Sequence, residues 1–146
     1  MKNIDTTDVP QANSLRRVCD LLALVAVGIE EKQALMAQLG LVTRELDYYK
    51  HAARILGFAH FEPQAFYLTD QGRSYLKVVS PEEKREILAG AVRQAQVFRE
   101  LLSNFQENEL KRENVTDFLV ERTELNRTTA RRRADTLLAW LKYTRE

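Results

Sequence analysis

Residues 32–76, KQALMAQLGLVTRELDYYKHAARILGFAHFEPQAFYLTDQGRSYL, decide the fold. Gly40 separates two helical stretches, and glycine suits the left-handed conformation that ends a helix and turns the chain. We expect a helix over residues 31–39 and a second over residues 43–56, capped by Thr43 and ended by Gly57. The inward stripe of that second helix is Val42, Leu46, Tyr49, Ala53 and Leu56. Two helices joined by a tight turn form a helix-turn-helix, a motif typical of DNA recognition.

Two aromatic-rich stretches follow, at residues 58–61 and 66–68, and predict a small β-hairpin. Pro63 belongs in the loop between them, residues 62–65, because proline cannot donate to a strand ladder. Thr69 then caps a helix over residues 70–79. Ser80 and Pro81 begin a long fifth helix. Its apolar stripe is Leu88, Ala91, Ala95, Phe98 and Leu102.

The N-terminal residues 1–12 are mostly polar, contain Pro10, and predict a flexible arm. Asn13 or Ser14 can cap the next segment, where apolar residues at three- and four-residue spacing predict a first amphipathic helix. Those residues are Leu15, Val18, Leu22, Val25 and Ile29. The expected fold class is therefore mainly α with a small β-hairpin. We divide the chain into the arm (1–12), a first unit (13–80) and a second unit (81–146).

The run from Phe66 to Gly72, FYLTDQG, resembles the Y-x-L-T-x-x-G run that follows the wing in many prokaryotic winged-helix proteins. The order of elements before it fits the same family, so the resemblance covers residues 13–79. It implies a winged helix-turn-helix, with the helix over residues 43–56 in the major groove of DNA and the hairpin wing on the backbone.

The second unit resembles a second helix-turn-helix, without room for a wing after it. A helix is expected over residues 111–122, a turn over 123–126, and a helix over 127–141. The last helix has Ala130, Ala134, Leu137, Leu138 and Leu141 on one side. The long fifth helix would serve as its first helix and couple the two units. Such tandem modules resemble the recognition parts of some restriction systems as well as transcription regulators, and no motif separates the two.

The face opposite the core stripe of the helix over residues 43–56 supplies candidate DNA contacts. Arg44 lies in the first turn, where a recognition helix most often reaches base edges, and arginine can bond guanine in bidentate fashion. In the first unit the DNA-binding candidates are Arg44, Tyr48, His51, Arg54 and, in the wing, Gln64. Asp47 lies on the same face and is unfavourable near phosphates unless it orients an arginine. The alternative is an ordinary solvated polar face.

The last helix supplies the second set of candidates: Arg127, Thr128, Thr129, Arg131, Arg132 and Arg133. Three successive arginines cannot all face one partner, because neighbouring residues in a helix point 100° apart. We expect Arg132 toward the groove, and Arg131 and Arg133 toward phosphates or acidic neighbours. The alternative is a helix stabilised by ion pairs to Glu121 or Glu124.

Net charge is +1, which by itself does not indicate a nucleic-acid partner. The charge is uneven, however: residues 127–146 contain six basic and two acidic side chains. Hydrophobic residues make up 45% and charged residues 29% of the chain, a composition typical of folded soluble proteins. The longest apolar run is too short to cross a bilayer and no signal peptide is visible, so a cytoplasmic location is expected.

The sequence shows no pattern typical of a catalytic or cofactor site. Cys19 is the one cysteine, and His51 and His60 are the two histidines, so neither a disulfide nor a metal site is expected. The five glycines are dispersed at caps and turns, and no phosphate-binding loop is present. We therefore expect no enzyme activity, no cofactor and no metal.

Sequence-specific binding to double-stranded DNA through helices 43–56 and 127–141 is the function expected. The protein would act as a transcription regulator or as the recognition part of a restriction-type system, with a homodimer or a catalytic or regulatory protein as further partners. The alternative is a winged-helix module for protein–protein interaction or dimerisation. Apolar residues beyond those that one stripe needs favour it: Val97, Phe98, Leu101, Leu102, Phe105, Ile55, Trp140 and Tyr143.

Overall fold

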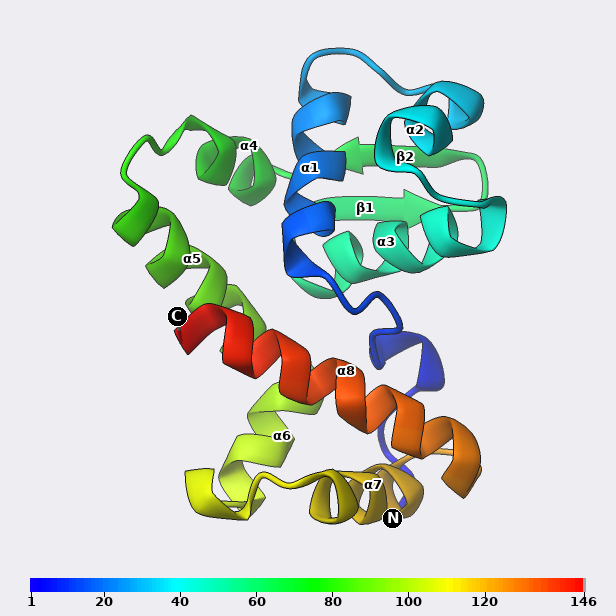
Figure 1. Cartoon of the computed structure of the whole chain (residues 1–146), viewed down its shortest axis with the longest axis vertical. Helices are drawn as coiled ribbons and strands as arrows, with labels where there is room; N and C mark the ends of the chain where they lie inside the picture. The colour runs from blue at the N-terminus through cyan, green and yellow to red at the C-terminus, as the bar shows by residue number, and fades with distance from the viewer. Residues whose placement is uncertain (146) are drawn as a thin grey trace.

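Three helices, a hairpin and a fourth helix make up the N-terminal half of the chain (Figure 1). The computed structural model describes residues 1–145. The elements of this half are α1 (Leu15–Ala26), α2 (Lys32–Leu39), α3 (Thr43–Ile55), β1 (Ala59–Glu62), β2 (Ala65–Leu68) and α4 (Asp70–Lys77). With the helices of the C-terminal half, they confirm the predicted fold class: mainly α with one small antiparallel hairpin.

The turn between α2 and α3 forms as the glycine pattern predicts. Gly40 has φ 67° and ψ 38°, and its N–H bonds to the carbonyl of Met36. The predicted cap at Thr43 is wrong, since α3 begins there and Val42 is the cap residue. Val42 has no polar side chain; its N–H donates instead to Glu45 Oε1 at 3.1 Å. Val42 is 57% exposed, so the prediction that it belongs to the inward stripe is wrong.

The hairpin is longer than predicted and its turn is tighter. Ala59 pairs with Leu68 and Glu62 with Ala65, so the turn contains only Pro63 and Gln64. The FYLTDQG run forms the corner that follows. Thr69 Oγ1 donates to the Gly57 carbonyl at 2.7 Å and accepts from the Gly72 N–H at 3.0 Å. One hydroxyl thus joins the end of α3 to the start of α4.

Four helices and a short 3-10 turn form the C-terminal half: α5 (Pro81–Gln94), α6 (Gln96–Asn104), η2 (Glu107–Glu109), α7 (Arg112–Arg122) and α8 (Arg127–Arg145). The predicted long fifth helix is wrong, because the chain breaks at Ala95, which has φ −63° and ψ 137°. The change of direction allows Val97, Phe98 and Leu101 all to be fully buried. A straight helix with the predicted stripe would leave one of these three side chains outside.

The predicted flexible arm is also wrong. Ile4, Val9 and Ala12 are buried, and the Ile4 N–H donates to the Arg122 carbonyl at 3.0 Å. The segment includes a short 3-10 turn, η1 (Thr6–Asp8), and passes between α3 and α8 in Figure 1. Its apolar side chains belong to one continuous core that includes residues of both halves. Polar composition suggested a loose arm, but three apolar side chains anchor it.

Most of the apolar residues that favoured an interaction module lie inside the molecule. Val97, Phe98, Leu101 and Trp140 are fully buried, and Leu102, Phe105 and Ile55 are half-buried against the same core. The Trp140 indole stacks on the Phe98 ring with centroids 5.6 Å apart, and its N–H donates to the Ala12 carbonyl at 2.8 Å. Tyr143, at 43% exposed, is the residue of that set with the largest exposed fraction. Most of these side chains are therefore part of the core, and Trp140 joins α8 to α6 and to the N-terminal segment.

A carboxylate also ties the N-terminal segment to the C-terminal half. Glu100 accepts hydrogen bonds from Asn3 Nδ2 at 3.0 Å, Gln96 Nε2 at 3.0 Å and Arg122 Nη1 at 2.6 Å. Its pKa is lowered, chiefly by the bond from Asn3 and further by Gln96 and Arg122. The ionised form of Glu100 is thus the one that stabilises the fold.

Glu100→Gln is expected to lower the free energy of unfolding by about 1 kcal/mol at neutral pH, since it removes a charged acceptor from a partly exposed network. A lowered folded-state pKa gives stability that is present above the unfolded value, about 4.3, and is lost as the pH falls through the folded value. The difference between wild type and variant should therefore shrink at about pH 3. Urea denaturation at both pH values measures it, and an equal difference at both would contradict the charge-based account.

Candidate nucleic-acid interface

The start of α3 presents an arginine, Arg44, to solvent. Arg44 is exposed, and no carboxylate of residues 1–145 forms an ion pair with it. Asp47 is exposed one turn further on. The first turn of α3 thus offers to solvent the arginine that was expected to reach base edges.

Further along α3, the predicted outward face meets the chain itself. Arg54 Nη1 pairs with Asp8 Oδ1 at 3.0 Å, and its Nη2 donates to the Thr7 carbonyl at 2.7 Å. These contacts fasten the N-terminal segment to the end of α3. The prediction that Arg54 faces an open DNA surface therefore fails because the segment expected to be loose covers it.

His51 packs between α3 and the hairpin. Its ring meets Phe61 edge-on at 4.8 Å between centroids, and its Nδ1 is buried without a hydrogen-bond partner among residues 1–145. Burial lowers the pKa of His51, and the nearby charge of Arg54 lowers it further. The ring is therefore neutral at pH 7 and serves the packing of the hairpin more than a phosphate contact.

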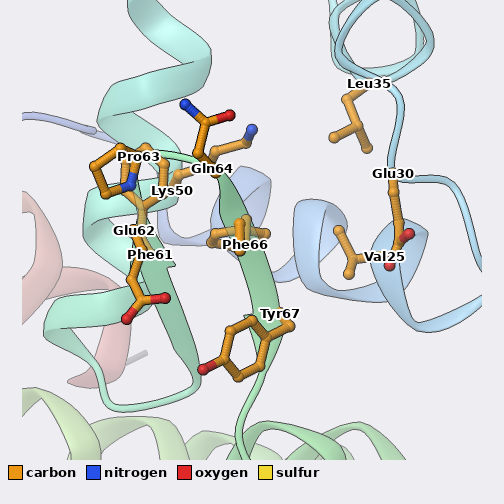
Figure 2. Close-up of a pocket in the computed structure, with 11 residues that line it drawn as sticks. Val25, Glu30, Leu35, Lys50, Phe61, Glu62, Pro63, Gln64, Phe66 and Tyr67 are labelled. Atoms are coloured by element: carbon orange, nitrogen blue, oxygen red, sulfur yellow. The ribbon is translucent and has the colours of Figure 1, made fainter.

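A basic group from α3 lies beside the hairpin, and it was not among the residues predicted from the sequence. Gln64 and Pro63 are exposed at its turn, and Lys50 from α3 lies beside that turn (Figure 2). Lys50 Nζ lies 5.7 Å from the centroid of Phe61 and 5.6 Å from that of Phe66. The hairpin turn itself, residues 62–65, contains no lysine or arginine. The position of Lys50 in the sequence could have indicated this, because Lys50 stands between the core residue Tyr49 and His51, which faces the hairpin.

The first turns of α8 contain both paired and unpaired arginines. Arg127 pairs with Asp117 at 2.7 Å, not with the Glu121 or Glu124 expected under the ion-pair alternative. Arg131 and Arg132 are exposed and form no ion pair within the described residues; Arg132 Nη2 approaches Thr129 Oγ1 at 3.4 Å. Thr128 is exposed, and the Thr129 N–H donates to Asn126 Oδ1 at 2.9 Å, which caps the helix.

Arg133 points inward instead. It is half-buried, and its Nη1 donates to the carbonyls of Thr6 at 3.1 Å and Val9 at 2.9 Å. Tyr48 from α3 joins Arg132 and Arg133 along a common cleft between α3, α8 and the N-terminal segment. The structure therefore brings Tyr48, Arg132 and Arg133 together across the two halves. Sequence reasoning had assigned them to two separate interfaces.

The three backbone segments that carry the candidate residues lie toward one edge of the molecule. In Figure 1 the start of α3, the turn of the hairpin and the start of α8 all lie on the right of the view. Arg44, Gln64 and the pair Arg131 and Arg132 belong to these three places. An edge with cations from separate elements can bind the regularly spaced phosphates of a duplex.

In the part of the chain that the structure describes, no three His, Cys, Asp or Glu side chains come together as metal ligands would. None of the helices in residues 1–145 has the length and apolar character needed to cross a membrane.

Comparison with known proteins gives a family without an assigned activity. Fold and surface define a mainly helical protein with a hairpin beside a helix-turn-helix arrangement and an arginine-bearing edge. The chain belongs to the family described as a domain of unknown function (DUF7226), which matches residues 17–146. No curated protein and no solved structure matches the chain. Its function is therefore argued from its own residues.

Proposed function

We propose that this protein binds double-stranded DNA at the edge formed by the start of α3, the hairpin turn and the start of α8. The observation that carries the proposal is the exposure of Arg44, Arg131 and Arg132 without a carboxylate partner among residues 1–145. Unpaired arginines retain their full attraction for phosphate and for the guanine edge. Lys50 and Gln64 extend the surface at the hairpin.

The arrangement of α2, α3 and the hairpin supports a winged helix-turn-helix mode of binding, as the resemblance implied. Arg44 in the first turn of α3 supplies base contacts, and α8 supplies grip on the backbone through Arg131 and Arg132. Either a transcription regulator or the recognition part of a restriction-type system fits this role, alone or as a homodimer. Because the DNA of a prokaryote lies in the cytoplasm, the proposal implies a cytoplasmic location. It assigns no reaction to the chain.

Arg44→Ala and Arg132→Ala are each expected to weaken binding to a short duplex by about tenfold, the effect of losing one good arginine contact of roughly 1–3 kcal/mol. Both side chains are exposed, so the melting temperature should stay within a degree or two of wild type. Fluorescence anisotropy of a labelled duplex measures the affinity.

Arg85→Ala is the matched control, because Arg85 is an exposed arginine on α5 and forms no ion pair within residues 1–145. It removes the same charge from a surface outside the proposed edge, so binding should be nearly unchanged. If all three variants weaken binding equally, attraction depends on net charge alone and the proposed edge is wrong.

A further inference from the structure

The cleft between α3, α8 and the N-terminal segment has the properties of a small binding site. Its volume is about 200 Å³. Its walls come from all three segments: Gln11, Asn13, Tyr48, Arg132, Arg133, Asp135 and Thr136. Asn13 and Arg132 are exposed, so the cleft opens to solvent.

The cleft holds positive charge that no carboxylate of residues 1–145 neutralises through an ion pair. Arg133 is half-buried, and among residues 1–145 its partners are two backbone carbonyls and no carboxylate. Burial lowers the pKa of Arg133, the adjacent charge of Arg132 lowers it further, and Tyr48 acts in the opposite direction. Guanidinium groups that lose solvent are normally paired with an anion.

The carboxylate in the cleft is occupied elsewhere. Asp135 Oδ2 pairs with Arg112 Nη2 at 3.0 Å, across from α7. Its charge is thus balanced by a residue outside the cleft, and both arginines of the cleft keep theirs. The walls therefore favour an anion over a cation or a neutral molecule.

Neutral donors complete the walls. The buried Thr136 hydroxyl donates to Asn13 Oδ1, which fixes that amide so that its NH2 group is the free end. Neither the Asn13 NH2 group nor the Tyr48 hydroxyl has a hydrogen-bond partner within the described part of the chain. Two guanidinium groups, a hydroxyl and an amide around one small space match the several acceptor oxygens of a phosphate group.

We propose that this cleft binds a phosphate group, with Arg132 and Arg133 supplying charge and Tyr48 and Asn13 supplying hydrogen bonds. A free phosphorylated small molecule and a backbone phosphate of DNA present the same chemistry. If the ligand is a free phosphorylated molecule, the proposal does not require DNA binding. If the ligand is a backbone phosphate, the proposal rests on the proposed function. Because the cleft is shared by both halves of the chain, its ligand also fixes α3 relative to α8.

Inorganic phosphate is the probe, titrated into the full chain by isothermal calorimetry in chloride buffer. Arg132→Gln should weaken phosphate binding about tenfold and Tyr48→Phe, which removes one hydroxyl, about threefold. Lys142→Gln is the matched control: it removes the same charge from an exposed position on α8 outside the cleft, and should leave binding unchanged. Circular dichroism checks that each variant is folded.

A labelled duplex, with and without phosphate, separates the two sources. Saturable phosphate binding that depends on Tyr48 and Arg132 supports the site. If phosphate also competes with the duplex, the cleft binds a backbone phosphate of DNA. If phosphate binds but does not compete with the duplex, the cleft binds a free ligand. No phosphate binding, but a duplex affinity that falls in Tyr48→Phe, supports the backbone form. The proposal is overturned if neither probe responds to Tyr48→Phe and Arg132→Gln, or if Lys142→Gln has the same effect as Arg132→Gln. Failure of the duplex to bind, with phosphate still bound in the cleft, would reject the proposed function alone.

Discussion

Gly72→Ala is expected to lower the free energy of unfolding by more than about 3 kcal/mol, since it adds a methyl group where backbone atoms leave no space. A Cβ at this position would overlap the Phe58 carbonyl oxygen and come within 3.0 Å of its carbonyl carbon. Neither group can move freely: the same carbonyl accepts from the Thr69 N–H at 3.0 Å, and the Gly72 N–H donates to Thr69 Oγ1. The variant must break this corner to relieve the overlap.

Gly90→Ala is the matched control for that substitution. Gly90 lies inside α5, and a Cβ there would meet no atom within 4 Å. Alanine is the better helix former by about 0.8–1 kcal/mol, so this variant should be slightly more stable than wild type. Chemical denaturation followed by circular dichroism measures both variants. A Gly72→Ala variant as stable as wild type would show that α4 and the hairpin are not joined as described.

Trp140→Ala is expected to cost about 3–5 kcal/mol, the usual range for emptying a large aromatic site in a core. Trp140 is fully buried, stacks on Phe98, and satisfies the Ala12 carbonyl with its N–H. The substitution opens a cavity between α6 and α8 and leaves a buried carbonyl without its donor. The N-terminal segment should loosen as a result, because it loses one of its contacts with α8.

Tyr143→Ala provides the comparison on the same helix, one turn beyond Trp140. Tyr143 is 43% exposed, so its loss should cost no more than about 1 kcal/mol. Differential scanning calorimetry measures the stabilities, and amide hydrogen exchange at residues 3–12 follows the segment. If both variants have the same melting temperature, the burial of Trp140 against Phe98 does not contribute to stability as described. If exchange at the segment is unchanged in Trp140→Ala, the contact with Ala12 does not anchor it.

The local signals in the sequence explain why most of the fold could be predicted. Gly40 and Gly57 have positive φ angles at the ends of α2 and α3, where glycine was expected. Ser14, Thr69 and Ser80 cap the helices that follow them. Each of these features depends on one or two residues and their immediate neighbours, and such dependence is visible in a sequence.

The break at Ala95 could not be predicted in the same way. Neither proline nor glycine marks it, and the stripe from Leu88 to Leu102 continues through it at helical spacing. The break exists because Val97 and Phe98 are both buried in a core that includes Trp140, far along the chain. Long-range packing of this kind overrides a local helical preference.

The candidate site was predictable only where it is local. Exposure of Arg44, Arg131 and Arg132 follows from helical periodicity alone. The roles of Arg54 and Arg133 do not, because both bind residues 6–9, a segment whose polar composition suggested no fixed structure. The cleft could not be predicted for the same reason: the N-terminal segment was expected to be flexible, and it forms part of the cleft walls.

Binding to a random-sequence duplex as a function of salt tests the proposed function most directly. The two arginine contacts to phosphate proposed for Arg131 and Arg132 should give a plot of log affinity against log salt with a slope of about −1.8 or steeper, at roughly 0.9 per phosphate. The double variant Arg44→Ala, Arg132→Ala should have a slope shallower by about 1, because Arg132 is the one of the two that is proposed to contact a phosphate. No measurable binding at low salt, or an identical slope in the double variant, would contradict a DNA-binding edge at α3 and α8.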